Sequence, residues 1–564
     1  MALTEKANAV VKQHFSGVDL NAVWTVPKES SFGDASLSLP LQLASKLKQK
    51  PRDVAQIFVD ALTGADGIEK VEIAGAGYVN VWLTPAGLLR ELSQTREACV
   101  PAVKREKERP VIVEYSQPNI AKPLGIHHIL STVVGQTISN LYRHLGYSTV
   151  AINHLGDWGT QFGKLAVAVE KWGKKPVEKM TLGDFLELYV RFHDEVEKDE
   201  TLEDAARAAF RKLEEKDPAL TQFWQIVVKT TMREVEAVYE RLGIHFDHVH
   251  GESFYQEKMQ TILDEGKKKG VFIEGEKGAL IAMFPEKTGM PPAIVLKGDG
   301  STIYHTRDLA TIRYRIDTWH PQSLLYVVDV AQQLYFQQLF DMVRQLGWEL
   351  PLLEHVVLGR MRFADRSMST RKGNILRLQE VLDEAVTRAQ KIIDERGDSI
   401  QTDDPRALAE MMGTGAVVYG IVSQNRKMDL IFDWDKMLSF EGNSAPYLQY
   451  TYARAKSVLR KAGAEGESEM PQVIAALTER ERILIRTLLQ FAAVLEDARS
   501  SHMPHTLANY LFGLCQDFNA FYNVDPIVSA AEPQRALRLA LTSMTARVLK
   551  TGAEILTLRV PERM

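Results

Sequence analysis

Cysteine is scarce in this sequence, because only Cys99 and Cys515 occur among its 564 residues. Two cysteines so far apart exclude a disulfide scaffold and a cysteine-rich zinc site, and their scarcity is typical of a reducing compartment. Long apolar runs are also missing: no run of about 18 apolar residues occurs, and the N-terminus lacks the basic and apolar segments of a signal peptide. We therefore expect a cytoplasmic protein with no membrane-spanning segment and no tightly bound metal.

A large excess of charge of either sign is absent as well. The 68 Lys and Arg residues and the 73 Asp and Glu residues give a net charge of −5, which excludes a generally basic coating for nucleic acid. A local basic face is compatible with this charge, since such binding depends on where Lys and Arg cluster. With 45% hydrophobic and 25% charged residues the composition is that of a globular protein, and 564 residues indicate about three to five domains.

The hydrophobic pattern predicts a multidomain α/β protein. Residues 1–103 have the pattern of an α+β domain. Helical periodicity occurs at residues 3–15 and 38–63, and residues 71–82 alternate as in a β-hairpin. Residues 405–564 show helical periodicity only, which predicts a C-terminal α-helical bundle without strands. The expected helices of the bundle lie near residues 406–423, 445–462, 473–498, 504–522 and 533–556.

The middle of the chain, residues 104–404, predicts a Rossmann-like, doubly wound parallel sheet. Short apolar runs suited to buried strands alternate there with helical stripes. The expected strands are residues 111–113, 148–152, 324–328 and 355–358, with helices at 126–145 and 333–346. A charged helical insertion at about 165–250 separates the two strand–helix–strand units.

The common phosphate-binding loops are absent. Gly163-Lys164 resembles the end of a P-loop, but Trp158 stands in place of the first glycine and Leu165 in place of the Ser or Thr. Two polar loops, residues 114–128 and 366–374, instead follow predicted strands at the carboxyl edge of the sheet, where such folds bind ligands. Either loop alone is compatible with an ordinary solvated loop, but together they favour a site for a polyphosphate.

These loops carry a resemblance to a known family. The segments Glu114 to His128, Asn153 to Gly163 and Arg366 to Asn374 closely resemble the arginyl-tRNA synthetases, which are class I aminoacyl-tRNA synthetases. Similar segments that match the N-terminal tRNA-contacting domain and the anticodon-binding helical domain of that family are Gly77 to Asn80, Ala445 to Arg454 and Val560 to Met564.

The resemblance implies an arginine–tRNA ligase. Such an enzyme converts L-arginine and ATP, accompanied by Mg²⁺, to arginyl-adenylate, and transfers the arginyl group to the terminal adenosine of tRNA(Arg). The implied domains are a tRNA-contacting domain (1–103), a catalytic domain (104–404) and an anticodon-binding domain (405–564). Since members of the family are mostly monomers, we expect a monomer.

The resemblance also implies a site for arginine. The matching residues are Glu114, Ser116, Asn119, His154, Tyr304, Asp308 and Gln332. Asn119 matches the residue that holds the α-amino and carboxylate groups, whereas Glu114 and Asp308 match acids near the guanidinium. The chemistry agrees, because a planar guanidinium favours carboxylates, and two acids in one pocket repel each other until the cation arrives. A plainer interpretation makes Asp308 an acid at a helix N-terminus.

The implied ATP site departs from the family pattern. Its matching residues are Pro123, Gly125, His127, His128, Met368, Ser369, Thr370 and Lys372, and its implied catalytic residues are Lys122, His128, Arg371 and Lys372. In the first signature, His-x-Gly-His, Gly125 replaces a histidine and His127 replaces the glycine, so His127 either points away or narrows the site. In the second, Lys-Met-Ser-Lys-Ser, both lysines are missing, and nearby cations must compensate.

The implied contacts to tRNA are Tyr78, Asn80, Tyr447, Gln449, Tyr452, Arg454 and Met564. Tyrosines in this helix either stack on anticodon bases or pack within the bundle, and the sequence favours neither interpretation. Two other functions are left open. One is a tRNA-binding, synthetase-like protein with weakened adenylation, and the other is a ligase for another amino acid such as lysine.

Overall fold

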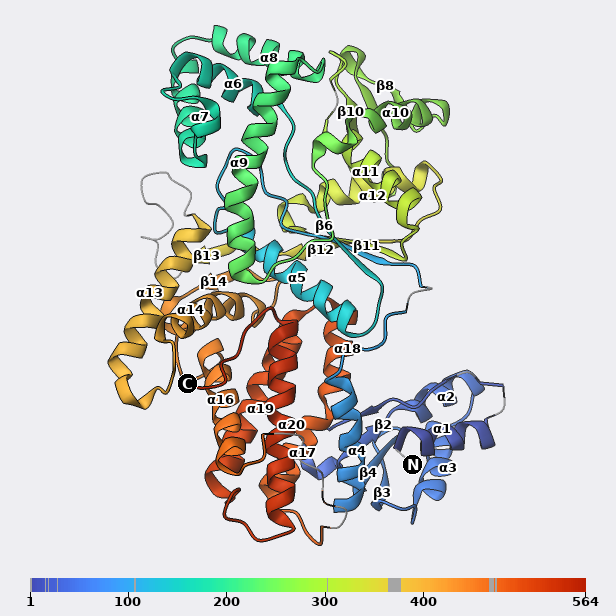
Figure 1. Cartoon of the computed structure of the whole chain (residues 1–564). Helices are drawn as coiled ribbons and strands as arrows, with labels where there is room; N and C mark the ends of the chain where they lie inside the picture. The colour runs from blue at the N-terminus through green and yellow to red at the C-terminus, as the bar shows by residue number, and fades with distance from the viewer. Residues whose placement is uncertain are drawn as a thin grey trace. The chain divides into compact units, whose positions relative to one another are not determined.

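The computed structural model describes residues 3–363 and 377–564, apart from residues 16, 19, 28, 106, 107, 302, 466–470, 472 and 473. The chain divides into two compact units (Figure 1). The sheet unit comprises residues 103–389 and 416–437, and the bundle unit comprises residues 1–102, 390–415 and 438–564. In the described part of the chain, no helix is long and apolar enough to cross a lipid bilayer.

A five-stranded parallel sheet in the order β12-β11-β5-β6-β7 lies at the centre of the sheet unit. Its strands are β5 (Val111–Glu114), β6 (Thr149–Asn153), β7 (His248–Val249), β11 (Ser323–Asp329) and β12 (Leu352–Leu358). The crossover helices α5 (His128–His144) and α12 (Gln333–Gln345) confirm the predicted doubly wound fold. Because the strand order reverses between β5 and β11, their carboxyl ends flank the crevice where such sheets bind ligands.

Four helices between β6 and β7 form the predicted helical insertion. They are α6 (Thr160–Trp172), α7 (Leu182–Val196), α8 (Thr201–Glu214) and α9 (Pro218–Leu242), with the short 3-10 helix η2 (Val177–Lys179) before α7. A separate apolar core that includes Phe162, Phe185 and Phe192 holds them together. Local signals agree with the helix ends, since α7 begins with a capping box of Thr181 and Asp184.

A small antiparallel sheet in the order β10-β9-β8 follows the insertion. The elements of this region are η3 (Glu252–Lys258), α10 (Met259–Lys268), β8 (Phe272–Glu274), η4 (Glu276–Gly278), β9 (Leu280–Ala282), η5 (Glu286–Thr288), β10 (Ala293–Leu296), α11 (Tyr304–Trp319) and η6 (Val330–Gln332). The sequence pattern does not predict this sheet, because strands of three or four residues are too short to show alternation.

The expectation that strands stop at about residue 405 is wrong. Strand β14 (Leu430–Phe432) pairs in parallel with β13 (Met361–Phe363) in the sheet unit. A pair of three-residue strands so distant in sequence has no local signal, so only the tertiary fold brings it together. The neighbouring helices are α13 (Leu378–Arg396), α14 (Pro405–Val422) and α15 (Trp434–Met437), with η8 (Gly397–Ser399) after α13.

The N-terminal part of the bundle unit is an α+β fold, as predicted. It comprises α1 (Leu3–His14), β1 (Trp24–Thr25), η1 (Ser30–Phe32), β2 (Ala35–Leu37), α2 (Leu39–Leu47), α3 (Pro51–Leu62), β3 (Ile68–Ala74), β4 (Tyr78–Leu83) and α4 (Pro85–Ala98). The four strands form an antiparallel sheet in the order β1-β2-β4-β3, and the predicted hairpin is β3–β4. The helical pattern at residues 38–63 divides into two helices after Lys48, whose φ is 54°.

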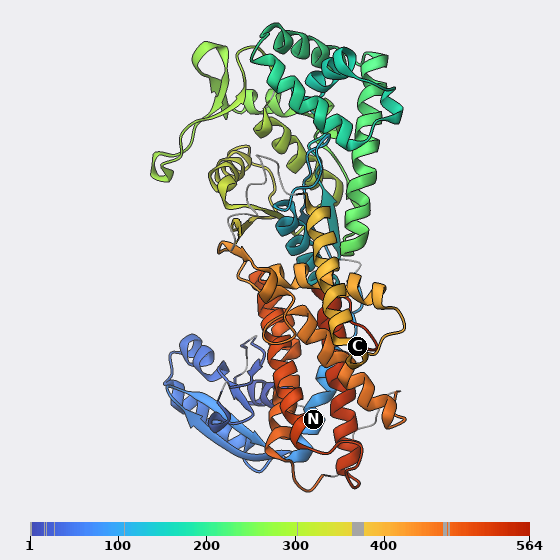
Figure 2. The ribbon, with the colours of Figure 1, turned by 90° about the vertical axis from the view of Figure 1, so that its left-hand side faces the viewer.

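The C-terminal part of the bundle unit is the predicted helical bundle (Figure 2). Its helices are α16 (Ala445–Lys461), α17 (Glu479–Leu489), α18 (Phe491–Ser501), α19 (Pro504–Val524) and α20 (Gln534–Ile555). A buried charge joins the bundle to the N-terminal fold: the Asp34 carboxylate accepts the Leu83 N–H at 2.8 Å and an N–H of Arg482 at 2.7 Å. Asp34 is 2% exposed, so these bonds are shielded from solvent.

Candidate functional site

The loop that follows β5 has an unusual backbone conformation. Ser116, Gln117 and Ala121 have φ values of 76°, 53° and 68°, in the left-handed region that residues with a Cβ seldom adopt. Surrounding contacts must hold such a loop in place, and outliers of this kind concentrate at functional sites. The loop after β6 supplies one of these contacts, because Asn119 and Gly156 form a β-bridge.

Gly156 also explains the position of the Asn119 side chain. A Cβ at residue 156 would lie 2.4 Å from Oδ1 of Asn119, a distance at which one of the two groups must move. The glycine therefore lets the exposed Asn119 amide lie against the backbone of the second loop. An amide held at the carboxyl edge of the sheet can both donate and accept hydrogen bonds to a zwitterionic ligand.

Ser116 belongs to a buried network beneath the loop. Its Oγ lies 2.6 Å from the Tyr239 hydroxyl and accepts a hydrogen bond from the Thr132 hydroxyl at 2.8 Å. The Asn153 amide donates to the same tyrosine oxygen at 3.1 Å. Since Ser116 is 3% exposed, the structure places its hydroxyl in the support of the loop rather than at an open surface.

The two histidines at the start of α5 have different surroundings. The Gly125 N–H donates to Nδ1 of His128 at 3.1 Å, and burial lowers the pKa of His128 to about 4. His128 is therefore neutral at pH 7, and its Nδ1 also lies 3.2 Å from the Gly125 carbonyl oxygen. His127 is exposed, and its ring centroid lies 4.0 Å from that of His128. His127, which stands in place of the signature glycine, thus adds an exposed side chain beside His128.

Lys122 is partly exposed in the same loop. Its ammonium nitrogen lies 5.0 Å from the centroid of the Tyr189 ring on α7, a cation–π contact. The second signature loop begins after β13, and the expected residues Met368, Ser369, Thr370, Arg371 and Lys372 lie outside the described residues. The first described residue after it, Arg377, forms a β-bridge with Gly125. That bridge places Arg377 beside the first signature.

Glu114, the last residue of β5, is paired with an arginine of the chain itself. Its Oε2 forms an ion pair with Nη2 of Arg315 on α11, and its Oε1 accepts the Gln117 amide at 2.5 Å. The side chains of Arg315 and Glu114 are 0% and 6% exposed. The expectation that Glu114 is an uncompensated acid before the substrate arrives is therefore wrong, because a resident guanidinium already neutralises it.

Asp308 has no ion-pair partner among the described residues. It lies one turn into α11, where Oδ2 accepts a hydrogen bond from the Tyr335 hydroxyl of α12. Burial, opposed by this hydrogen bond, raises the pKa of Asp308 to about 7. The plainer interpretation of Asp308 as an acid of the first helical turn is wrong, since α11 begins at Tyr304 and has no acid in its first turn.

A second ion pair lies next to Asp308. Arg307 donates to Glu252 of η3 at 2.7 Å, and both side chains are largely buried, at 11% and 12% exposed. The guanidinium carbon of Arg307 also lies 5.4 Å from the ring centroid of Tyr304, which is 68% exposed. Tyr304 is therefore exposed, with one face of its ring covered by Arg307.

The other two residues expected near arginine differ in burial. The ring of His154 is tilted against that of Tyr255, with ring centroids 5.6 Å apart, and its Nδ1 has no hydrogen-bond partner among the described residues. Burial lowers the pKa of His154 to about 4, so this imidazole is neutral at pH 7. Gln332 is exposed at the end of η6, immediately before α12.

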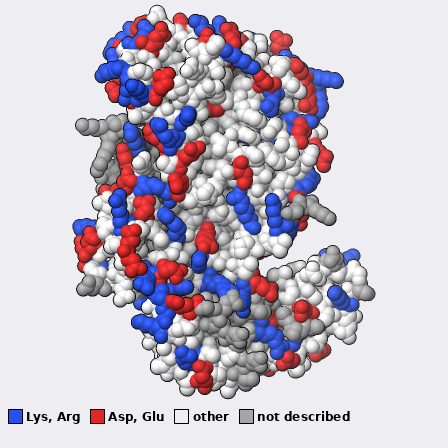
Figure 3. Space-filling model, viewed as in Figure 1, with Lys and Arg blue, Asp and Glu red and all other residues white. Residues whose placement is uncertain are grey.

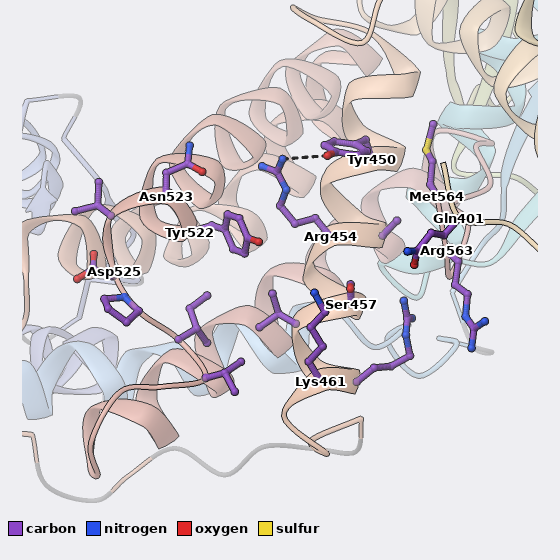
Figure 4. A pocket seen from close by; sticks show the side chains of 17 residues that line it. Gln401, Tyr450, Arg454, Ser457, Lys461, Tyr522, Asn523, Asp525, Arg563 and Met564 are labelled. Atoms are coloured by element: carbon purple, nitrogen blue, oxygen red, sulfur yellow. Dashed lines mark hydrogen bonds between the residues drawn. The ribbon is translucent and has the colours of Figure 1, made fainter. Parts of the chain in front are cut away.

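A pocket of about 490 Å³ opens in the bundle unit between α16, α19 and the C-terminal residues (Figure 4). Arg454 lies between two aromatic rings, with its guanidinium carbon 4.8 Å from the centroid of Tyr450 and 4.9 Å from that of Tyr522. Its Nη1 donates to Oδ1 of Asn519 at 2.6 Å. Other residues that line the pocket are Arg460, Lys461, Arg563 and Met564.

Three models of known domain families match the chain. They are "tRNA synthetases class I (R), catalytic domain" over residues 91–434, "DALR anticodon binding domain" over 448–564 and "Arginyl tRNA synthetase N terminal domain" over 2–83. The arginine–tRNA ligase of Fusobacterium nucleatum subsp. nucleatum is 38% identical over 100% of this chain and 99% of its own length. This chain belongs to the arginyl-tRNA synthetase family.

As a member of this family, the chain is an ATP-dependent arginine–tRNA ligase of class I. The arginine–tRNA ligase of Chloroflexus aurantiacus is 37% identical over 88% of this chain and 87% of its own length. The fold agrees with the solved arginyl-tRNA synthetases of Thermus thermophilus and Plasmodium falciparum, each with a TM-score of 0.80 over 100% of this chain. They are 24% and 22% identical, and 99% and 98% of their chains are covered.

The residues expected to contact tRNA in this synthetase divide by their exposure. Arg454 and Met564 line the pocket. Gln449 is 1% exposed and donates to the Arg559 carbonyl at 2.9 Å, whereas Tyr452 is 2% exposed and donates to Glu562 at 2.7 Å. The Tyr447 hydroxyl accepts the Asn519 amide at 3.1 Å. The structure thus places these three side chains in hydrogen bonds within the bundle.

The N-terminal part shows the same division. Tyr78, at the start of β4, is 44% exposed, whereas Asn80 is 4% exposed in the same strand. On the face of the synthetase shown in Figure 3, Lys and Arg side chains are interspersed with Asp and Glu, which agrees with the balanced composition. Basic character for tRNA is therefore local rather than general.

Several residues at these sites were not predicted from the sequence. Arg315 and the Arg307–Glu252 pair surround the two expected acids, and Tyr522 completes the stack on Arg454. Arg315 had one usable signal, because it follows Asp308 by seven residues and so shares its helix face. Tyr522 and Glu252 have none, since both come from elements distant in sequence.

Proposed function

We propose that this ligase activates L-arginine at the carboxyl edge of the parallel sheet, next to Asp308. The carboxylate of arginine attacks the α-phosphate of ATP, which forms arginyl-adenylate and releases pyrophosphate. A hydroxyl of the terminal adenosine of tRNA(Arg) then attacks the carbonyl carbon, and AMP leaves. The observation that carries the proposal is Asp308, a buried carboxyl that accepts a hydrogen bond from a phenol and forms no ion pair with any described residue.

The guanidinium of arginine would complete the ionisation of Asp308. A cation next to a carboxyl of raised pKa favours its charged form, and charge-assisted hydrogen bonds to a guanidinium are among the strongest in proteins. In this proposal Glu114 lies close to the same guanidinium, and Asn119 holds the α-amino and carboxylate groups. Tyr304 and Gln332 would cover the bound side chain from the exposed edge, while His154 and Ser116 support the loops.

ATP would lie over the start of α5. In this proposal the backbone of Pro123 and Gly125 contacts ATP, and the neutral His128 donates a hydrogen bond to a phosphate. His127 borders the nucleotide. Lys122, which lies in the loop before α5, would stabilise the negative charge that develops on the phosphates. We also assign Met368, Ser369, Thr370, Arg371 and Lys372 to the ATP site, because they match the second signature of the family. Magnesium enters as an ion bound to ATP.

The pocket around Arg454 would receive an anticodon base. Aromatic rings and cations are the groups that bind single-stranded nucleotides, and the pocket offers Tyr450, Tyr522, Arg454 and Met564. Gln449, Tyr452 and Tyr447 would then act indirectly, because their hydrogen bonds hold the pocket walls. Tyr78 and Asn80 would form a second contact to tRNA.

We further propose that the protein works as a cytoplasmic monomer. Its functional domains would be a tRNA-contacting domain (1–103), a catalytic domain (104–404) and an anticodon-binding domain (405–564). The N-terminal family model, 2–83, lies within 1–103, whereas the catalytic model ends at 434 rather than 404 and the anticodon-binding model begins at 448 rather than 405. Size-exclusion chromatography with light scattering tests the monomer. A mass of twice the chain would contradict it.

The proposed reaction is tested by charging tRNA with labelled arginine, with labelled lysine in a matched reaction. We expect arginine-specific charging that requires ATP and Mg²⁺. Tight binding of tRNA without pyrophosphate release would instead favour a protein with weakened adenylation, in which the changes at Gly125 and His127 are not compensated. Charging with lysine would contradict the assignment of Asp308 and Tyr304 to arginine.

A further inference from the structure

Arg315 is a buried cation on the same helix face as Asp308. The two residues are separated by seven positions of α11, or two turns, and the Arg315 side chain is 0% exposed. A guanidinium removed from water is costly unless an opposite charge lies next to it. Its ion-pair partner is Glu114 Oε2, at the end of β5.

The environment of Arg315 keeps it charged. Burial opposes the charge, but the Glu114 carboxylate holds the pKa of Arg315 above its ordinary value. The guanidinium carbon also lies 5.6 Å from the ring centroid of Tyr326 on β11, the residue in register with Glu114. The cation is therefore held between a strand end, a ring and its own helix.

We infer that Arg315 is a positioning residue that neutralises and orients Glu114, so that the site offers the incoming amino acid one uncompensated carboxyl, that of Asp308. This inference deepens the proposed function and rests on it. One unpaired carboxyl matches the single positive charge of an arginine side chain. Two unpaired carboxyls would repel each other in the empty site and would both favour protonation.

The charges around Asp308 determine how this inference is tested. The groups that face it are Tyr335 of α12, Glu114 of β5, Glu252 of η3, Tyr326 of β11, and Arg315 and Arg307 of α11. Glu114 and Glu252 disfavour its ionisation, whereas Arg315 favours it. Removal of Arg315 or of Glu114 must therefore shift the titration of Asp308 in opposite directions.

The experiment is a titration of the full chain with L-arginine by calorimetry, without ATP, from about pH 5.5 to pH 9. The measured quantity is the pH at which arginine affinity has its midpoint. We expect Arg315→Met to raise this midpoint by about one pH unit, and Glu114→Gln to lower it by about half a unit or more. Glu114→Gln combined with Arg315→Met should return it to within about 0.3 units of the wild type.

A merely structural role for Arg315 predicts weaker binding with an unchanged midpoint. An unchanged midpoint in Arg315→Met, or shifts of the same sign in the two single variants, would overturn the inference. Arg315→Lys keeps the charge and should keep the wild-type midpoint. If melting curves show that the Arg315 variants do not fold, the isosteric Glu114→Gln decides, because a midpoint that stays or rises in that variant contradicts the inference.

The same data separate this inference from the proposed function. A wild-type protein that does not bind arginine would contradict the arginine site itself. Variants that bind arginine with an unshifted midpoint would contradict only the role of Arg315.

Discussion

The two proposed ligand-binding regions of this synthetase treat charge in opposite ways. At the edge of the parallel sheet, Glu114 and Glu252 are buried and already paired with Arg315 and Arg307, whereas Asp308 has no ion-pair partner among the described residues. In the pocket of the bundle the cations are the available groups. Arg454 stacks between Tyr450 and Tyr522, and the acid that lines the pocket, Asp525, pairs with Arg538 at 3.2 Å.

The difference agrees with the size and charge of the ligand that we propose for each region. A small cationic side chain can be enclosed, so its recognition depends on one carboxyl in a place of low dielectric, where charge–charge interactions are strong. A polyanionic strand is not enclosed, and its recognition depends on cations and rings that face solvent. In the proposed function, the sheet region therefore gains selectivity from burial, and the bundle pocket gains affinity from accessible charge.

The largest expected effect comes from Asp308→Asn, which removes the charge from the sheet region while it keeps the shape. We expect the KM for arginine to rise at least about a hundredfold, because loss of one partner from a buried ion pair costs about 3–5 kcal/mol. Arginine-dependent pyrophosphate exchange in the presence of tRNA measures it. The matched control is Asp317→Asn, an exposed acid of the same helix, which should change the KM less than about twofold. An unchanged KM in Asp308→Asn would contradict the role of a buried carboxyl in the sheet region.

Lys122→Ala is expected to have the next largest effect. If Lys122 stabilises the phosphates, adenylate formation should fall at least about tenfold, with a smaller effect on the KM for arginine. Single-turnover formation of arginyl-adenylate measures this directly. Lys171→Ala, which removes an exposed lysine from α6, serves as control. Unchanged turnover in Lys122→Ala would assign the phosphate charge to another cation.

Arg454→Ala tests the other side of the comparison. We expect the Kd for tRNA(Arg) to rise about tenfold, and the slope of log Kd against log salt to decrease by about one, because one accessible cation is lost. The KM values for arginine and ATP in pyrophosphate exchange should stay the same. Lys550→Ala, an exposed lysine of α20, is the control for charge alone. Equal losses in the two variants would show that the stacked position of Arg454 is unimportant.

The smallest expected effect is a dependence of arginine binding on pH. The pKa of Asp308 in the free protein is raised to about 7, so the carboxyl is increasingly protonated below that pH. Bound arginine favours the carboxylate, hence binding releases a proton and weakens as pH falls. Between about pH 7.5 and pH 6.5 we expect a loss of about threefold in affinity. Calorimetry in buffers of different ionisation enthalpy detects the proton, and Asp308→Asn should lack both effects.

Sequence reasoning succeeded for elements whose pattern is local and long enough to read. The apolar runs at 111–113 and 324–328 are strands β5 and β11, and the stripe after residue 126 is helix α5. It failed for β8, β9, β10 and β14, which have three or four residues each and acquire their stability from partners. A helical pattern does not show whether a tyrosine is buried, so the sequence could not tell that Tyr452 is buried whereas Tyr450 lines the pocket.

The sequence by itself determined the family, the doubly wound sheet and the segments that meet at its carboxyl edge, because these depend on motifs and on periodicity along the chain. Only the tertiary structure decided which acid lacks a cation. Glu114 and Asp308 look equivalent in the sequence, but the approach of Arg315 to one and of Tyr335 to the other makes them different. Charge compensation is a property of distances of a few ångströms between elements far apart in the chain, and folding alone sets those distances.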